Sequence, residues 1–295
     1  MRRAWHLIRD SVIAWDRDRA ARKGAALAFY TVFSLAPVLV IAIAIAGIFL
    51  GRDAARGEIV SQIRGLIGED GAHAVQAIIE NAGTHKAGKL AGLAGFVTLI
   101  VGATTALAEL KDGLDQIWDV PPKTASGLWY FMRKRLFSIS LIFALAFLLL
   151  VSLVFSAMLT ALARYWGGPQ NFASAVLEVV NFIFSFALTT ALFGLIYKLL
   201  PSVRIAWRDV LIGALVTAFL FSVGKYLIGV YLGNGAVTSG YGAAGSVILI
   251  LIWVYYSAQI FFLGAEFTKV YAHRFGSLRA APISDGGLTK ISTDS

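Results

Sequence analysis

Long runs of apolar residues dominate this sequence. Each run reaches or exceeds the roughly 20 residues that an α-helix needs to cross the hydrocarbon core of a membrane. Lipid offers no hydrogen-bond partner to backbone amides, and the runs lack the alternating segments of about 10 residues that mark a membrane barrel. The pattern therefore predicts an all-α polytopic membrane protein with about six spanning helices, at about 27–50, 91–110, 136–163, 175–200, 207–232 and 244–270.

Two other segments have the spacing of amphipathic helices that do not cross the membrane. In residues 4–16, Trp5, Ile8, Val12 and Trp15 recur at helical intervals, which predicts an interfacial helix. The connection 51–90 carries two apolar stripes, which predict two short helices separated near Gly68 and Gly71. These helices either pack on the bundle or bind the membrane surface.

The last residues differ in composition from the rest of the chain. The stretch 276–295 is rich in Gly, Ser and Thr, and it is predicted to form a disordered tail. The chain is thus expected to form one six-helix membrane domain, residues 1–275, followed by this tail.

Composition supports a membrane protein and narrows its chemistry. Hydrophobic residues make up 58% and charged residues 15% of the chain, whereas a soluble domain has about 45–50% and about 25%. The absence of cysteine excludes disulfides, thiolate metal sites and cysteine catalysis. The net charge of +9 fits binding to anionic lipid headgroups. No basic stretch carries a nucleic-acid motif, so membrane lipids and not nucleic acid are the expected partners.

The distribution of Lys and Arg predicts the orientation. Of the 26 Lys and Arg residues, 19 lie in the N-terminal segment and in the second, fourth and last connections, on one side of the membrane. Positive residues accumulate in cytoplasmic loops. Both termini are therefore predicted to be cytoplasmic.

Ionisable residues inside a membrane span are costly and are therefore candidates for function. Lys225 in the fifth span lies roughly 10 Å below the predicted outer interface, at 1.5 Å per residue. It either pairs with Glu178 or extends its ammonium to the headgroups, or else it lies on a substrate pathway. Glu109 and Glu266 lie near the inner ends of the second and sixth spans, where a structural role competes with a functional one.

Uncharged polar residues add further candidates. Such residues face other helices, where they form interhelical hydrogen bonds or line a polar cavity. Asn181 belongs to a polar stripe on the fourth span, and Gln259 lies on roughly the same face of the sixth span as Glu266. The complete set of transport-pathway candidates is Lys225, Tyr226, Tyr241, Asn181, Gln259, Glu266 and Glu109.

Several short motifs, in order along about residues 25–270, resemble a known family. They are ALAFYT at 26–31 with SLAP at 34–37, Ala106-Leu107 with Ile117-Trp118, LLP at 199–201 with WRD at 207–209, and YGAAGS at 241–246 with WVY at 253–255 and LGAE at 263–266. Together they resemble the YihY/BrkB family of bacterial inner-membrane proteins. The resemblance implies six helices in the bacterial inner membrane and no agreed biochemical activity.

Members of that family were once labelled ribonuclease BN, but the residues here do not support an enzyme. The sequence shows no cluster of carboxylates or histidines spaced to hold catalytic metal ions, no nucleophile elbow and no Walker loop. We therefore expect no catalytic residue, no metal and no cofactor.

Three functional hypotheses remain open. The first is a transporter or translocase of a lipid or other amphipathic envelope molecule, with Lys225, Tyr226 and Tyr241 meeting an anionic headgroup. The second is a non-transporting scaffold that binds envelope-assembly proteins. The third is an ion- or proton-coupled exchanger that uses Glu266 and Glu109. The oligomeric state stays open.

Overall fold

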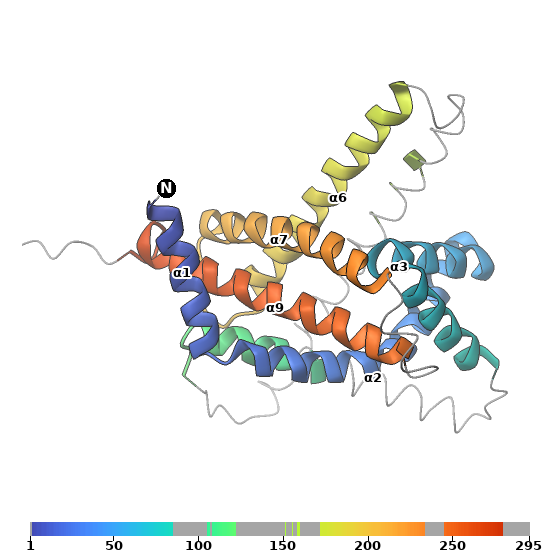
Figure 1. Cartoon of the computed structure of the whole chain (residues 1–295), viewed down its shortest axis with the longest axis horizontal. Helices are drawn as coiled ribbons and strands as arrows, with labels where there is room; N and C mark the ends of the chain where they lie inside the picture. Colours follow the sequence, from blue (N-terminus) through green and yellow to red (C-terminus); the bar gives the residue numbers. More distant parts are fainter. Residues whose placement is uncertain are drawn as a thin grey trace, which may run out of the picture.

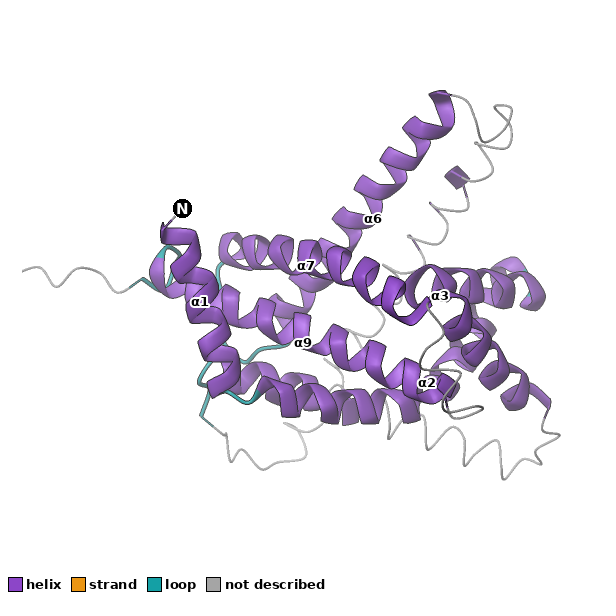
Figure 2. Ribbon diagram, viewed as in Figure 1, coloured by secondary structure: helices purple, strands orange, loops and turns teal. Residues whose placement is uncertain are grey.

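The structure is a computed structural model, and it describes residues 2–84, 105–106, 108–121, 151, 155, 158–159, 172–233 and 245–279. Every regular element among these residues is helical, which confirms the predicted all-α class (Figure 2). The helices are α1 (Arg2–Arg17), α2 (Ala20–Leu50), α3 (Arg52–Thr84), α6 (Phe172–Leu199), α7 (Trp207–Gly233) and α9 (Gly245–Arg274). Residues 108–117 are helical as well.

Helix α9 is the centre of the bundle. It contacts α1, α2, α3 and α7, and it runs beside α2 and α7 over much of its length (Figure 1). Helix α1 lies across one end of these three helices and α3 covers the opposite end. Helix α6 packs against α7 and then diverges from it, so that its first turns lie away from the bundle.

Among the described residues, three helical stretches are long and apolar enough to cross a membrane: Val179–Leu199, Trp207–Ile228 and Val247–Arg274. They lie in α6, α7 and α9, which correspond to the fourth, fifth and sixth predicted spans. The predicted first span, 27–50, forms the later part of α2. The predicted spans at 91–110 and 136–163 lie almost entirely outside the described residues.

The first connection differs from its prediction. Helix α3 runs without interruption from Arg52 to Thr84, so the prediction of two short helices was wrong. A glycine inside a helix costs only about 1 kcal/mol relative to alanine, and no proline interrupts this segment, so Gly68 and Gly71 do not end the helix. Gly51, with φ of 81°, makes the sharp turn between α2 and α3.

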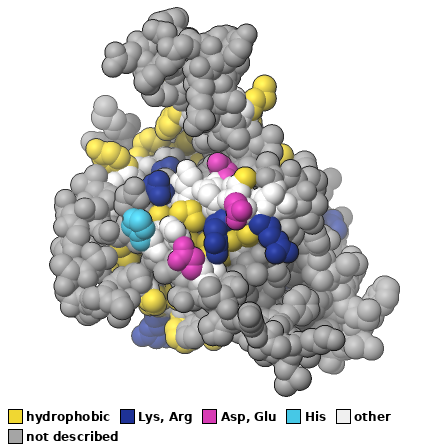
Figure 3. All heavy atoms as spheres, turned by 90° about the vertical axis from the view of Figure 1, so that its right-hand side faces the viewer, with side chains coloured by type: hydrophobic (Ala, Val, Ile, Leu, Met, Phe, Trp, Pro, Cys, Tyr) yellow, Lys and Arg dark blue, Asp and Glu magenta, His cyan; other side chains and the backbone are white. Residues whose placement is uncertain are grey.

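The end of the molecule at α3 is charged. In Figure 3, which looks onto this end, Lys, Arg, Asp and Glu side chains lie close to one another. Exposed charged residues of α3 include Arg52, Asp53, Arg64 and Glu80. Charged side chains are mostly exposed to water, so this end of the molecule is suited to solvent outside the membrane.

Helices α7 and α9 are held together by two reciprocal glycine–threonine contacts. A Cβ on Gly213 would lie 1.8 Å from Oγ1 of Thr268, and a Cβ on Gly264 would lie 1.9 Å from Oγ1 of Thr217. Each threonine hydroxyl donates to the carbonyl four residues earlier in its own helix, at 2.7 Å. Small residues allow close backbone approach, which is the main source of helix association in lipid.

The end of α9 is tied to the start of α7. Buried Asp209 accepts hydrogen bonds from the backbone amide of Ser277 at 2.8 Å and from its hydroxyl at 2.7 Å. The described chain therefore continues in a defined turn through Arg279, past residue 276, where the tail is predicted to begin. The predicted tail from 280 onward lies outside the described residues.

Candidate functional site at the junction of α1, α2 and α9

The junction where α1 meets α2 lies against α9 and contains two buried carboxylates. Glu266 on α9 is fully buried, and neither of its carboxylate oxygens has a hydrogen-bond partner among the described residues. An unpartnered buried charge is strongly destabilising, by several kcal/mol for a carboxylate. Glu266 is therefore a residue that the fold alone does not explain.

Asp18 is the second carboxylate, and it forms the turn between α1 and α2. The next residue, Arg19, has φ of 52° and ψ of 39°, a left-handed conformation that turns the chain sharply from α1 into α2 (Figure 1). Asp18 is 8% exposed. Its Oδ1 accepts from Nε of Arg17 at 3.3 Å, whereas its Oδ2 has no partner within the described ranges.

The carboxyl groups of Asp18 and Glu266 are neighbours that interact with each other. Ionised carboxylates only accept hydrogen bonds, so two of them face each other without a bond between them. A single hydrogen on either group would turn it into a donor.

Cations lie near the pair, but neither Lys269 nor Arg17 donates a hydrogen bond to Glu266. Lys269 and Arg17 attract Glu266 electrostatically. The ammonium of Lys269, however, lies 2.5 Å from Oδ2 of Asp119, so that its hydrogen bond goes to the exposed side of the junction.

Lys23, one turn into α2, connects the junction to the helical segment 108–117. Its ammonium donates to Oε1 of Gln116. Burial lowers the pKa of Lys23, and the carboxylates of Asp18, Asp112, Glu109 and Glu266 act in the opposite direction. Lys23 is thus a partly buried cation among four acids from three segments.

Close packing seals the junction. A Cβ on Gly24 would lie 2.1 Å from Nε2 of Gln259, and a Cβ on Gly113 would lie 2.6 Å from the ring of Phe262. The amide of Gln259 donates to the carbonyl of Ala21 at 3.5 Å, while its buried Oε1 has no partner in the part of the chain that the structure describes. Polar atoms here are therefore enclosed by helices on several sides.

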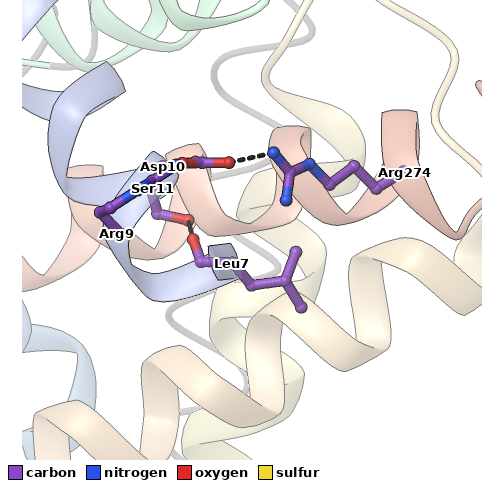
Figure 4. A network of polar contacts seen from close by, with 5 residues as sticks. All are labelled: Leu7, Arg9, Asp10, Ser11 and Arg274. Atoms are coloured by element: carbon purple, nitrogen blue, oxygen red, sulfur yellow. Dashed lines mark hydrogen bonds and ion pairs between the residues drawn. The ribbon is translucent and has the colours of Figure 1, made fainter. Parts of the chain in front are cut away.

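Helix α1 is fixed across α9 by a pair of charges. Arg274 of α9 donates to the carboxylate of Asp10, which also lies 3.1 Å from the guanidinium of Arg9 (Figure 4). The side of α1 away from the bundle exposes a line of apolar side chains, Trp5, Ile8 and Val12. This is the arrangement of a helix that rests on a membrane surface.

The structure brings three of the predicted residues to this junction. Glu266 and Glu109 both interact electrostatically with Lys23. Gln259 lies two turns before Glu266 on α9, and its amide donates to the carbonyl of Ala21 in α2. Asn181 lies elsewhere, in α6, and Lys225 and Tyr226 lie on the exposed face of α7. Tyr241 and the side chain of Glu178 lie outside the described parts of the molecule, and so does the predicted pair of Lys225 with Glu178.

Three members of the junction were missed from the sequence: Asp18, Lys23 and Gln116. They lie outside the apolar runs, where charged residues are common and no periodicity singles them out. The only signal was their position next to the first and second predicted spans. Among the residues that the structure describes, no group of three or more His, Cys, Asp or Glu residues is placed to hold a metal ion.

Comparison with known proteins identifies relatives of the whole chain. It is 27% identical over 269 residues to a UPF0761 membrane protein of Teredinibacter turnerae, which covers 90% of this chain and 60% of the relative. A UPF0761 membrane protein of Neisseria meningitidis serogroup B is 29% identical over 255 residues, covering 85% of this chain and 58% of the relative. The chain thus spans about three fifths of the length of these relatives. No solved structure matches.

The family described as virulence factor BrkB matches residues 12–285. This match includes α2 through α9 and both carboxylates of the junction. The chain therefore belongs to the YihY/BrkB family of membrane proteins.

Proposed function

We propose that this protein is an inner-membrane transporter or translocase of a lipid or other amphipathic envelope molecule. In this proposal six helices span the membrane and both termini are cytoplasmic, so that the junction of α1, α2 and α9 lies on the inner side. The single observation that carries the proposal is the burial of Glu266 inside an apolar helix, with no hydrogen-bond partner in the described parts of the chain.

A buried carboxylate without a hydrogen-bond donor indicates a functional role for that residue. Ionisable groups in membrane helices are rare because they are costly, and they mark substrate pathways and proton relays. A scaffold needs only packed helices, and an apolar residue at 266 would stabilise such a bundle at least as well as a glutamate. The acidic junction is thus easier to explain in a protein that moves something than in one that only binds partners.

The outer surface of α7 supports an amphipathic cargo. Lys225 and Tyr226 are exposed there, Tyr226 to 72%, beside the apolar side chains of Val223 and Leu227. A flexible lysine stem presents its ammonium to headgroups while its methylenes remain in apolar surroundings. This surface therefore offers one cation and one aromatic ring to an anionic headgroup at the lipid boundary.

The test is a flux assay with the purified chain in liposomes. Fluorescent anionic phospholipid in one leaflet is followed by its accessibility to a quencher. We expect Glu266→Gln to slow transfer at least tenfold, and Lys225→Ala to slow it less. Glu80→Gln, an exposed change on α3, is the matched control and should transfer lipid at the wild-type rate.

Two results would oppose this function. If wild-type liposomes transfer lipid no faster than protein-free liposomes, lipid translocation is wrong. If Glu266→Gln transfers as fast as wild type, Glu266 has no part in transport. Cation flux without lipid transfer would instead favour the ion- or proton-coupled exchanger, for which the acidic junction is also the supporting observation.

A further inference from the structure

We propose that Asp18 and Glu266 bind one proton between them, and that this shared proton joins the α1–α2 turn to α9. The coupling of the proton to a cargo rests on the transport function proposed above. The binding itself does not, because it follows from the chemistry of the junction.

The first argument concerns hydrogen-bond donors. Glu266 Oε1, Glu266 Oε2 and Asp18 Oδ2 are buried, and none of them has a donor among the described residues. The two side chains are neighbours that interact with each other, yet both only accept hydrogen bonds while ionised. One proton taken from water adds to one carboxylate oxygen, and the resulting hydroxyl donates to the other carboxylate. The pair then carries one negative charge in place of two.

The second argument concerns the charged groups that face the pair from each neighbouring segment. Arg17 on α1 donates to the other oxygen of Asp18, Lys23 on α2 donates to Gln116, and Lys269 on α9 donates to Asp119. Glu109 and Asp112 of the segment 108–117 add further negative charge near Lys23. No cation in this set donates a hydrogen bond to Glu266, so a proton supplies what the neighbours do not.

The number of ligands favours a proton over a larger cation. Calcium takes six to eight oxygen ligands and magnesium close to six. The junction offers two carboxylates, and in the described residues no third Asp, Glu or His completes a metal-binding group. A proton needs only two oxygens at hydrogen-bonding distance.

The position of Asp18 gives the proton a structural consequence. Only Asp18 and Arg19 separate α1 from α2, so a force on Asp18 acts directly on the angle between the two helices. Loss of the proton leaves two like charges facing each other in a medium of low dielectric constant, where repulsion is strong. Deprotonation should therefore separate the turn from α9 and move α1 across the end of the bundle.

Infrared difference spectroscopy tests proton binding directly. The full chain in lipid nanodiscs is compared at acidic and alkaline pH, and the carbonyl stretch of a protonated buried carboxyl group is recorded. We expect this band in the wild type and its loss in Glu266→Gln. In Asp18→Asn the band should shift in frequency, because the hydroxyl of protonated Glu266 no longer donates to a carboxylate. Asp112→Asn removes an exposed carboxylate near the same lysine and should keep the band.

Two variants are tested so that a misfolded one does not decide the result. If Glu266→Gln does not give a monodisperse helical protein, Asp18→Asn alone decides, since the band must change in frequency there if the proton is shared. An unchanged band in whichever variant folds overturns the proposal. A band that is lost as expected while lipid transfer is absent in the wild type would retain proton binding and reject the transport function.

Movement of α1 has its own readout. The chain has no cysteine, so His6→Cys and Ala108→Cys provide two labelling sites, both at exposed positions. Position 6 lies twelve residues before Asp18, roughly 18 Å along the helix. We expect the distance between spin labels to increase with pH in the wild type and to stay constant in Glu266→Gln, because the glutamine amide donates to Asp18 at every pH. A distance that changes equally in both proteins would overturn the role of the proton in holding α1.

Discussion

The α7–α9 interface and the junction of α1, α2 and α9 both bury polar groups, but they treat them in opposite ways. At the interface, Tyr197 donates to the carbonyl of Phe261 at 2.7 Å and lies 3.1 Å from the hydroxyl of Thr217, which itself has a backbone partner. At the junction, Glu266 and one oxygen of Asp18 have no partner among the residues that the structure describes. Satisfied polar groups specify a fixed packing, whereas unsatisfied ones mark a place whose occupancy can change.

The largest effect is expected from adding a methyl group to the close-packed α7–α9 interface. In Gly264→Ala, the new methyl group would lie 1.9 Å from Oγ1 of Thr217 and 2.7 Å from the hydroxyl of Tyr197. Neither neighbour can retreat without losing its hydrogen bond, so we expect a loss of about 3 kcal/mol in the free energy of unfolding, at the upper end for overpacking. Thermal unfolding in detergent micelles measures it.

Gly57→Ala is the matched control, because a Cβ there meets nothing within 4 Å. It should leave stability unchanged or raise it by about 0.5–1 kcal/mol, since alanine is a better helix former than glycine. Equal destabilisation by both substitutions would show that the interface is not specially close-packed.

The junction should respond in the opposite direction. Glu266→Gln replaces a buried acid by a neutral side chain of the same shape, and its amide donates to Asp18. We expect stabilisation of about 1–2 kcal/mol at alkaline pH, where the wild-type pair has lost its shared proton. The wild type should lose stability as pH rises, because its native state holds a proton that the unfolded chain has released.

Unfolding measured at several pH values checks both statements. The difference in unfolding free energy between Glu266→Gln and the wild type should grow with pH. No such growth is expected for Glu80→Gln compared with the wild type. A Glu266→Gln protein that is less stable than the wild type at every pH would mean that the carboxylate has a partner that stabilises it.

A smaller effect is expected for a single hydroxyl at the interface. Tyr197→Phe removes the donor to the Phe261 carbonyl and keeps the ring among its aromatic neighbours. We expect a loss of about 1 kcal/mol in unfolding free energy, the usual net value of one hydrogen bond. Tyr226→Phe removes an exposed hydroxyl from α7 and should change stability by less than about 0.5 kcal/mol; a similar loss in both variants would remove the special role of Tyr197.

The smallest effect is expected at the surface pair that fixes α1. Arg274→Gln breaks its contact with Asp10, and exposed ion pairs contribute about 0.2–1 kcal/mol. The more sensitive measurement is limited proteolysis, in which cleavage within α1 should become faster while cleavage elsewhere is unchanged. Arg279→Gln provides the comparison, and equal protection of α1 in both variants would show that Asp10 and Arg274 do not hold it.

The sequence predicted the apolar helices well for a simple physical reason. The same continuous apolar run that lipid requires is what a hydropathy pattern detects, so the bounds of α6, α7 and α9 agree with their predictions to within four residues. Helix α2 begins seven residues before the predicted span, because residues 20–26, which include Arg22 and Lys23, are helical without belonging to the long apolar run. Continuity of α3 through Gly68 and Gly71 depends on packing against α2, α7 and α9, which no local pattern reveals.

The site was predicted in part. Glu109 and Glu266 were placed on the same side of the membrane by helix direction, and both act on Lys23 in the structure. Asp18 and Lys23 could not be found in the same way, because they belong to a charged segment in which only the fold determines which side chain is buried. A charged residue stands out in the sequence when apolar residues surround it, as Glu266 does. Its partner in a polar turn, Asp18, does not stand out.

The contact between α1 and α9 also constrains how the protein is made. Asp10 and Arg274 are 264 residues apart in the chain, so at about 5–20 residues per second a ribosome needs roughly 13–53 s to supply the second after the first. During that time α1 has its apolar side chains but not its final neighbour. Adsorption to the membrane surface would keep it from aggregating, so that α1 takes its place in the bundle only after α9 has been made.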